Sequence, residues 1–268
     1  MTSISTLFSV SGKNVLVTGG SRGIGLMIAK GFAQNGANVL ITSRDETACR
    51  DAAVLIGPNC QFVTSNLSSR DGCAELAKHT SNIFHGRLDV LVNNAGSSWG
   101  ESLEREHTRS NWGWDKVLDL NVKGLFYLSR QCVPLLERKS GEDPGRIINI
   151  GSVAGLIPQE APTHAYDVSK AAVHHLTKKL AFDFAKRSIT VNAIAPGFVP
   201  SKMSDGLKNY AAFEKIASAT PLGRMGNSDD MSSACIYLSS QAGSWVTGTI
   251  LVVDGGTVGA LQIPLSSL

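Results

Sequence analysis

The sequence has no apolar run long enough to cross a bilayer, because its longest runs, such as NVLVTG and TILVVDG, have only the length of a strand. Its first residues, MTSISTLFSVSGKN, lack the basic start, apolar centre and cleavage site of a signal peptide. The five cysteines are scattered and form no CxxC pair, which argues against a disulfide framework and a zinc site. These absences predict a cytoplasmic protein with reduced thiols and no membrane span.

The charge pattern also excludes some partners. The formal net charge is +3, and no dense run of lysine and arginine occurs, so neither nucleic acid nor an anionic membrane is predicted as a partner. His174 and His175 are adjacent and therefore lack the i, i+4 spacing of a helical metal pair, and we predict no metal site. With 43% hydrophobic and 18% charged residues in 268, the chain has the composition of a globular protein with a sizeable core.

Short β-branched runs alternate with amphipathic stretches of helical length. Strands are expected at 14–19, 38–42, 60–65, 88–93, 146–151, 189–195 and 249–255. Helices are expected at 24–35, 45–56, 69–84, 115–139 in two pieces, 163–186, near 204–218, and 228–239. Strands this apolar are buried on both faces, and strict alternation gives right-handed crossovers. No linker rich in proline or glycine divides the chain. The pattern predicts an α/β fold over 1–268: a single-domain Rossmann fold with a doubly wound, seven-stranded parallel sheet and helices on both faces.

A glycine-rich turn, TGGSRGIG, joins the first strand to the first helix at Thr18–Gly25. Glycines at such a turn let the backbone approach a pyrophosphate, and the helix N-terminus favours its negative charge. The spacing is G-x-x-x-G-x-G rather than the general GxGxxG. The position after the first strand favours a dinucleotide, and a glycine-rich turn without a ligand stays open as the alternative.

The end of the second strand, ITSRD, bears on the phosphate state of the cofactor. An NAD site usually offers an acidic residue here for the ribose 2′-hydroxyl, but Ser43 and Arg44 occupy the place, and Arg22 lies in the glycine turn. Guanidinium groups suit a 2′-phosphate because they make charge-assisted, bidentate bonds. Asp45 comes one residue late and is expected to cap the next helix. We therefore predict NADP(H) over NAD(H), with solvated surface arginines as the alternative.

Tyr166 and Lys170 are four residues apart in HAYDVSKAAVHHL and share one helix face. A nearby ammonium favours the phenolate, so Lys170 is expected to lower the pKa of Tyr166. Ser152 follows the fifth strand and lies at its carboxyl end, where the long helix could bring Tyr166 beside it. Ser152 could then hold a substrate oxygen while Tyr166 gives or takes its proton. Taken alone, each of the three residues has a structural alternative: Tyr166 and Lys170 could be ordinary surface residues, and Ser152 could be an ordinary loop residue.

Over Ser11 to about Gly256, the chain resembles the short-chain dehydrogenase/reductase family. The motifs that carry the resemblance are TGGSRGIG, NNAG (93–96), Asn121 in LNVKG, Ser152, YDVSK (166–170), NAIAPG (192–197) and DGG (254–256). The chain is most similar in character to the 3-oxoacyl-carrier-protein reductase-like members, including the rhamnolipid-type reductases. The resemblance implies a tetramer assembled through long helices, with a dimer as the other expected assembly.

The resemblance also implies the roles of individual residues. Tyr166 would be the general acid/base, Lys170 would lower its pKa and bind the nicotinamide ribose, Ser152 would orient the carbonyl, and Asn121 would hold a water in a proton relay. The cofactor is expected to contact Gly19, Ser21, Arg22, Gly23, Ile24, Gly25, Ser43, Arg44, Asn66, Leu67, Asn93, Ala95, Gly96, Tyr166, Lys170, Pro196, Gly197, Val199 and Ser201.

Departures from the family pattern bear on the substrate. Asn66 and Leu67 stand where many members have Asp and an aliphatic residue. Ser152 and Tyr166 are separated by one residue more than is common, so the intervening loop is expected to be reshaped. Phe182 stands where carrier-protein-specific members usually have arginine.

The loop at 97–112 and a lid near 197–222 are expected to close the pocket. Their apolar side chains Trp99, Met203, Leu207, Tyr210 and Phe213 favour a medium-sized apolar ketone or a 3-oxoacyl thioester.

Together these features predict an NADPH-dependent carbonyl reductase that transfers a hydride between nicotinamide and a ketone. The alternative is a non-redox NADP-binding protein on the same fold, such as a sensor, a scaffold or a cyclase. The complete Asn, Ser, Tyr and Lys set argues against that alternative, because a binding module needs no activated phenol.

Overall fold

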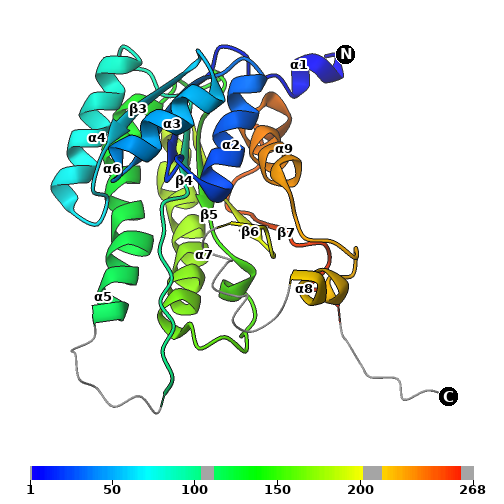
Figure 1. Ribbon diagram of the computed structural model, residues 1–268. Coiled ribbons are helices and arrows are strands. Elements are labelled where there is room, and N and C mark those ends of the chain that lie inside the picture. Colours follow the sequence, from blue (N-terminus) through cyan, green and yellow to red (C-terminus); the bar gives the residue numbers. More distant parts are fainter. Residues whose placement is uncertain (1, 104–111, 202–212, 261–268) are drawn as a thin grey trace.

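The computed structural model (Figure 1) describes residues 2–103, 112–201 and 213–260. Its strands form one parallel sheet in the order β3-β2-β1-β4-β5-β6-β7. The strands are β1 (Asn14–Thr18), β2 (Asn38–Ser43), β3 (Cys60–Thr64), β4 (Val90–Asn93), β5 (Gly145–Ile150), β6 (Ile189–Pro196) and β7 (Ile250–Val253). The chain starts near the middle, winds to one edge and then to the other. This order confirms the predicted doubly wound sheet.

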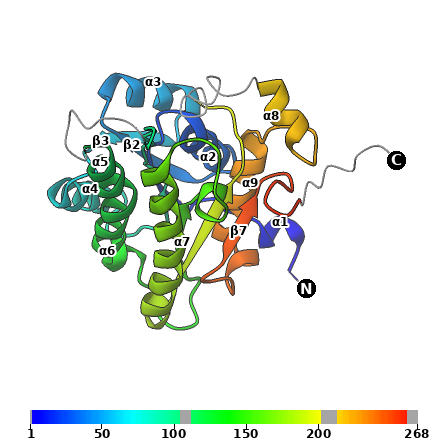
Figure 2. The same ribbon diagram turned by 90° about the horizontal axis from the view of Figure 1, so that it is seen from below.

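Helices cover both faces of the sheet. One layer contains α2 (Gly23–Gln34), α3 (Glu46–Ile56) and α9 (Ser228–Ser239), and the other contains α4 (Arg70–Ile83), α6 (Leu125–Leu136) and α7 (His164–Phe184), as the view from below also shows (Figure 2). Alternate residues of a strand point to opposite faces of the sheet. Val15 and Val17 therefore pack in the core on the side of α2, and Leu16 packs in the core on the side of α4. Within the described residues, no helix combines the length and apolar character that a membrane span needs.

The helical region predicted over 115–139 in two pieces is divided as expected, and it runs from Trp112 to Leu136. It consists of α5 (Trp112–Leu118), a π-helical turn (Asp119–Gly124) and α6. The π-turn brings Gly124 against the carbonyl of Leu67, where an added Cβ would come within 2.2 Å of the oxygen. Periodicity alone does not reveal such a turn, because its apolar spacing differs from that of an α-helix by a single residue.

Other boundaries agree closely with the prediction. Asp45 caps α3 as expected, with its carboxylate accepting a hydrogen bond from the Ala48 amide at 3.0 Å. Of the helix predicted near 204–218, the structure describes α8 (Phe213–Ala219), and residues 202–212 lie outside the described part. A short helix that the sequence did not predict, α1 (Ile4–Leu7), precedes β1.

Candidate active site

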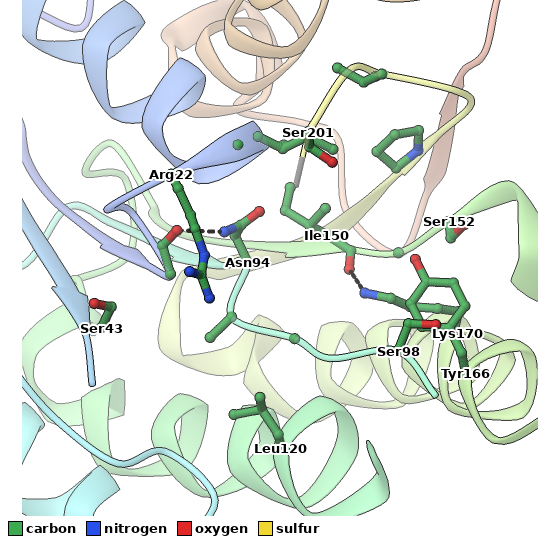
Figure 3. Close-up of a pocket in the computed structure, with 18 of the residues that line it drawn as sticks. Arg22, Ser43, Asn94, Ser98, Leu120, Ile150, Ser152, Tyr166, Lys170 and Ser201 are labelled. Atoms are coloured by element: carbon green, nitrogen blue, oxygen red, sulfur yellow. Dashed lines mark hydrogen bonds between the residues drawn. The ribbon is translucent and has the colours of Figure 1, made fainter. Parts of the chain in front are cut away.

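A cavity of about 680 Å³ lies at the carboxyl ends of the strands, where a doubly wound sheet binds its ligands. Most of the residues predicted to form the site line it (Figure 3): Gly19, Ser21, Arg22, Gly23, Ile24, Ser43, Arg44, Leu67, Ala95, Gly96, Ser152, Tyr166, Lys170, Pro196, Gly197, Val199 and Ser201. The fold therefore gathers side chains from β1 to β6 at one elongated cavity.

The glycine-rich turn forms one wall of the cavity. Gly19 and Gly23 have φ values of +64° and +54°, a region that favours glycine. Gly25 does not line the cavity; it lets α2 approach the turn closely, since an added Cβ would lie 2.3 Å from the Gly19 oxygen and 2.4 Å from Asn94 Nδ2. Helix α2 begins at Gly23, so its N-terminus faces the cavity with a partial positive charge suited to a phosphate.

A polar clamp that the sequence analysis missed holds this wall in place. The buried Thr18 hydroxyl donates to the Val92 carbonyl at 3.2 Å and accepts from the amides of Asn94 and Ala95, both at 2.9 Å. The Asn94 side chain donates in turn to the Thr18 carbonyl at 2.9 Å. Both residues lie within the quoted motifs TGGSRGIG and NNAG, and the Asn94 side chain, not that of Asn93, lines the cavity.

Two arginines and a serine lie at one end of the cavity, with Arg22 and Ser43 shown together in Figure 3. Arg22 and Arg44 are exposed, and within the described ranges neither takes part in an ion pair. Asp45 also lines this end, and its carboxylate accepts the α3 cap bond. A phosphate dianion could bind here, because this end offers two guanidinium groups, a hydroxyl and the nearby N-terminus of α3.

Ser152, Tyr166 and Lys170 lie together at the other end of the cavity (Figure 3). The Lys170 ammonium donates to the Ile150 carbonyl at 2.7 Å and lies 5.5 Å from the centre of the Tyr166 ring. Ser152 is buried where the chain leaves β5, and its hydroxyl accepts from the Ala154 amide at 3.1 Å. The helix of Tyr166 and Lys170 therefore meets the strand end of Ser152, as the sequence predicted.

The pKa of Tyr166 is shifted in the direction opposite to the prediction. The pKa of Tyr166 is raised above its usual value, chiefly by burial, while the neighbouring Ser152 hydroxyl lowers it in part. Burial also lowers the pKa of Lys170 to about 8. The predicted lowering of the tyrosine pKa by the lysine is thus not the dominant effect in the protein without ligand, because removing a phenolate from water costs more.

The remaining predicted residues make structural contacts beside the cavity. Asn93 donates to Ser129 and to Asn149 in the interior, each at 2.9 Å. Asn66 accepts from the Ser68 amide.

Asn121 is buried beneath the active-site group. Its side chain accepts from the Ser97 amide at 2.8 Å and donates to the Ser97 carbonyl and the Ser169 hydroxyl, both at 2.9 Å. It thus joins the loop after β4 to the helix that carries Tyr166 and Lys170.

Beyond Ser152, Tyr166 and Lys170, the cavity wall includes uncharged side chains from three loops. They are Ser98, Gln159, Ala161, Thr163 and Phe198, none of which was predicted. The backbone bond from Glu101 to Pro162, at 2.9 Å, joins the loop of Ser98 to the loop of Gln159.

The predicted lid is only partly described. Met203, Leu207 and Tyr210 lie outside the described residues, and Trp99 packs against Gly113 rather than lining the cavity. The described residues contain no group of three or more His, Cys, Asp or Glu side chains placed for a metal ion.

Comparison with known proteins identifies relatives over nearly the whole chain. The family model described as enoyl-(acyl carrier protein) reductase matches residues 19–258. The rhamnolipids biosynthesis 3-oxoacyl-(acyl-carrier-protein) reductase of Pseudomonas aeruginosa is 44% identical over 253 residues, which cover 93% of this chain and 97% of that protein. The 3-oxoacyl-(acyl-carrier-protein) reductase FabG of Rickettsia prowazekii is 36% identical over 250 residues, with 93% and 98% covered.

A solved structure agrees with the fold. The Pseudomonas aeruginosa RhlG/NADP active-site complex superimposes with a TM-score of 0.88 at 43% identity, covering 94% of this chain and 99% of that one.

Proposed function

The chain belongs to the short-chain dehydrogenase/reductase family, and we propose that it is an NADP(H)-dependent carbonyl reductase acting on a neutral ketone or 3-oxoacyl thioester. The observation that carries this proposal is the meeting of Ser152, Tyr166 and Lys170 in the same cavity as the glycine-rich turn. A bound dinucleotide would extend from that turn to the catalytic group. The non-redox alternative has no comparable support, because simple binding requires no acid beside an ammonium.

The residues at the catalytic end have complementary roles in this proposal. A reduced nicotinamide, when bound, supplies the hydride for the carbonyl carbon. Ser152 holds the carbonyl oxygen, and Tyr166 donates the proton to it. The raised pKa of Tyr166 keeps the phenol protonated at neutral pH, the form that reduction requires. The ammonium of Lys170, 5.5 Å from the centre of the Tyr166 ring, then stabilises the phenolate that forms, and Lys170 would also hold the nicotinamide ribose of a bound cofactor.

The role of Asn121 is a separate part of the proposal. Its side-chain contacts support a function in holding the helix of Tyr166 and Lys170 against the loop after β4. A proton relay that includes a water beside Asn121 remains an expectation from the family resemblance.

The preference for NADPH over NADH rests on the end of the cavity that contains Arg22, Ser43 and Arg44. The similar solved structure from Pseudomonas aeruginosa is a complex with NADP. Replacing Arg44 with alanine is expected to weaken NADPH by about 1.5–3 kcal/mol more than NADH, the size of a lost charged hydrogen bond. Dissociation constants from fluorescence titration test this; equal losses for the two cofactors would exclude a contact between Arg44 and the phosphate.

The substrate class follows from the charge of the wall around Tyr166. Ser98, Gln159, Thr163 and Phe198 are uncharged, and Lys170 is the one charged side chain among the described lining residues at this end. Among the described lining residues at this end, a small keto acid would find no arginine clamp. The names of the cited relatives also support a 3-oxoacyl substrate.

Initial rates of NADPH oxidation test the substrate assignment. The panel contains a 3-oxoacyl thioester without carrier protein, an apolar ketone, an enoyl thioester, a keto acid and a ketose. We expect the highest kcat/KM with the thioester or the apolar ketone. A higher value for the keto acid or the ketose contradicts this reading of the wall. A higher value for the enoyl thioester contradicts carbonyl reduction, and no oxidation with any substrate favours the non-redox alternative.

We also propose that the enzyme is a cytoplasmic homo-oligomer, a tetramer or a dimer. Phe182 at the end of α7 is 81% exposed, and Trp245 before β7 is 97% exposed. We expect both side chains to lie in the surface that a second copy covers. Light scattering of the wild type and of a Phe182→Lys/Trp245→Lys variant measures the assembly, and a monomeric wild type would contradict it.

A further inference from the structure

The hydroxyl of Ser43 lies between the backbone of Asp45 and the thiol of Cys49. Its Oγ is 3.3 Å from both the amide nitrogen and the carbonyl oxygen of Asp45, and 3.0 Å from Cys49 Sγ. Ser43 lines the cavity, whereas Cys49 is fully buried behind it with 0% of its surface exposed. Among the described residues, Ser43 is therefore the lining residue whose side chain bonds to this thiol.

The Ser43 hydroxyl has a single hydrogen, so it can donate to only one of its neighbours. A serine hydroxyl has one hydrogen to donate and two lone pairs to accept with, whereas a phosphate dianion only accepts. If Ser43 donates inward, to the Asp45 carbonyl or to the sulfur, an oxygen lone pair faces the phosphate. If the Asp45 amide and the Cys49 thiol both donate to Ser43, the serine hydrogen is left for the phosphate. A bound 2′-phosphate therefore favours the arrangement in which the thiol is the donor.

The position of Cys49 is fixed by the start of α3. Its amide donates to the Asp45 carbonyl at 3.0 Å, and Asp45 caps the same turn through the Ala48 amide. Complete burial leaves the thiol little room to move away from Ser43. The helix start thus places a donor behind the serine, on the side opposite the cavity.

We propose that Cys49 is a positioning residue for the ribose 2′-phosphate of the cofactor, acting through Ser43 to favour NADPH over NADH. The inference rests on the proposed function, because it assumes that Ser43 contacts this phosphate. It differs from a packing role in one respect: packing would affect both cofactors equally, whereas orientation of the Ser43 hydroxyl matters only to the cofactor that carries the phosphate.

The test measures dissociation constants of NADPH and NADH for the wild type and for Cys49→Ala, Cys49→Ser, Ser43→Ala and the Ser43→Ala/Cys49→Ala double variant. Cys49→Ala is expected to weaken NADPH by about threefold to tenfold, as for one neutral hydrogen bond, and NADH by less than about twofold. Cys49→Ser retains a donor and is expected to restore most of the preference. The double variant is expected to lose no more preference than Ser43→Ala alone.

Cys60→Ala is the matched control. Cys60 lies on β3, where burial and, to a smaller extent, the nearby Cys49 raise its pKa, and its own thiol contacts the Gln61 carbonyl rather than Ser43. This variant is expected to keep the NADPH preference of the wild type. If Cys49→Ala does not fold, Cys49→Val takes its place, because valine is closer to the thiol in volume and has no donor.

The outcomes separate the inference from the function it rests on. If Ser43→Ala reduces the NADPH preference and Cys49→Ala leaves the ratio unchanged, the inference is overturned and the phosphate assignment stands. If Ser43→Ala also leaves the ratio unchanged, the phosphate assignment is wrong and the inference fails with it. An equal loss for both cofactors in Cys49→Ala shows a packing role and likewise overturns the inference.

Discussion

At the glycine-rich end of the cavity, the Thr18 hydroxyl and the Asn94 side chain make hydrogen bonds to the neighbouring backbone, and Gly25 leaves no space for a methyl group. At the opposite end, Ser98 and Gln159 line the cavity, and the described part of the chain offers their side chains no hydrogen bond. The first end is thus formed by the fold before any ligand binds. The second leaves polar groups that a bound substrate could satisfy, so we expect specificity to be decided at this end.

After Tyr166, the largest effect is expected at Lys170, at the end of the cavity that also contains Ser152. Lys170→Ala removes the ammonium beside Tyr166 and the bond to the Ile150 carbonyl. We expect turnover to fall by about 10²-fold or more and NADPH to bind more weakly, because both catalysis and ribose binding lose a charged donor. Steady-state rates and NADPH titrations measure the two effects. A loss confined to turnover would place the lysine at the substrate end alone.

A pair of glycine substitutions compares the packing of the two ends. At Gly25 an added Cβ would lie 2.3 Å from the Gly19 oxygen, whereas at Gly100 the nearest atom, the Pro162 oxygen, is 3.5 Å away. We expect Gly25→Ala to lower the free energy of unfolding by about 1–3 kcal/mol. The matched variant Gly100→Ala is expected to stay within about 0.5 kcal/mol of the wild type. Chemical denaturation measures both, and similar values for the two variants would remove the proposed difference in packing.

A smaller effect, limited to the substrate, is expected at Gln159. Because the described part of the chain gives its amide no partner, Gln159→Leu is expected to leave the stability within about 0.5 kcal/mol of the wild type. The KM for a 3-oxoacyl thioester is expected to rise about twofold to tenfold, as for one lost hydrogen bond, with NADPH affinity unchanged. Steady-state kinetics at saturating NADPH provide the test. An altered NADPH affinity would show that Gln159 belongs to the cofactor end.

The smallest effect concerns His174, one turn beyond Lys170 on α7. Its pKa is lowered, mainly by burial, with further contributions from Lys170 and Lys178. The unfolded chain therefore binds a proton at His174 below about pH 6.5, while the folded protein does not until the pH is lower. We expect the free energy of unfolding to decrease as the pH falls below about 6.5. In the His174→Leu variant, the free energy of unfolding is expected to depend less on pH in this range. Equal pH slopes for the two proteins, measured by urea unfolding, would contradict the assignment.

The sequence predicted the parts of the molecule that local spacing encodes. The alternation of strands and helices, the turn at Thr18–Gly25 and the shared helix face of Tyr166 and Lys170 all lie within short segments. The Asn93 contact was not predictable in the same way. Its bond to Asn149 spans 56 residues and depends on the register of β4 with β5, which no local pattern determines.

The substrate end was the least predictable. Gln159 and Ser98 lie in loops whose course depends on the Glu101–Pro162 backbone bond, a contact between segments far apart in sequence. The direction of the pKa shift of Tyr166 was also mispredicted, because the sequence reveals the neighbouring lysine but not the burial that raises the pKa. The course of these loops and the pKa of Tyr166 therefore depend on tertiary contacts and desolvation, which sequence periodicity does not reveal.

The most direct test of the central claim is the activity of Tyr166→Phe with NADPH and a 3-oxoacyl thioester, measured together with its NADPH dissociation constant. The variant removes only the hydroxyl that is proposed to protonate the carbonyl oxygen. We predict a fall in kcat/KM of about 10²–10⁴-fold, the usual cost of losing a general acid, with NADPH affinity within about twofold of the wild type. Near-normal turnover in this variant would contradict the proposed role of Tyr166 and, with it, the account of the site.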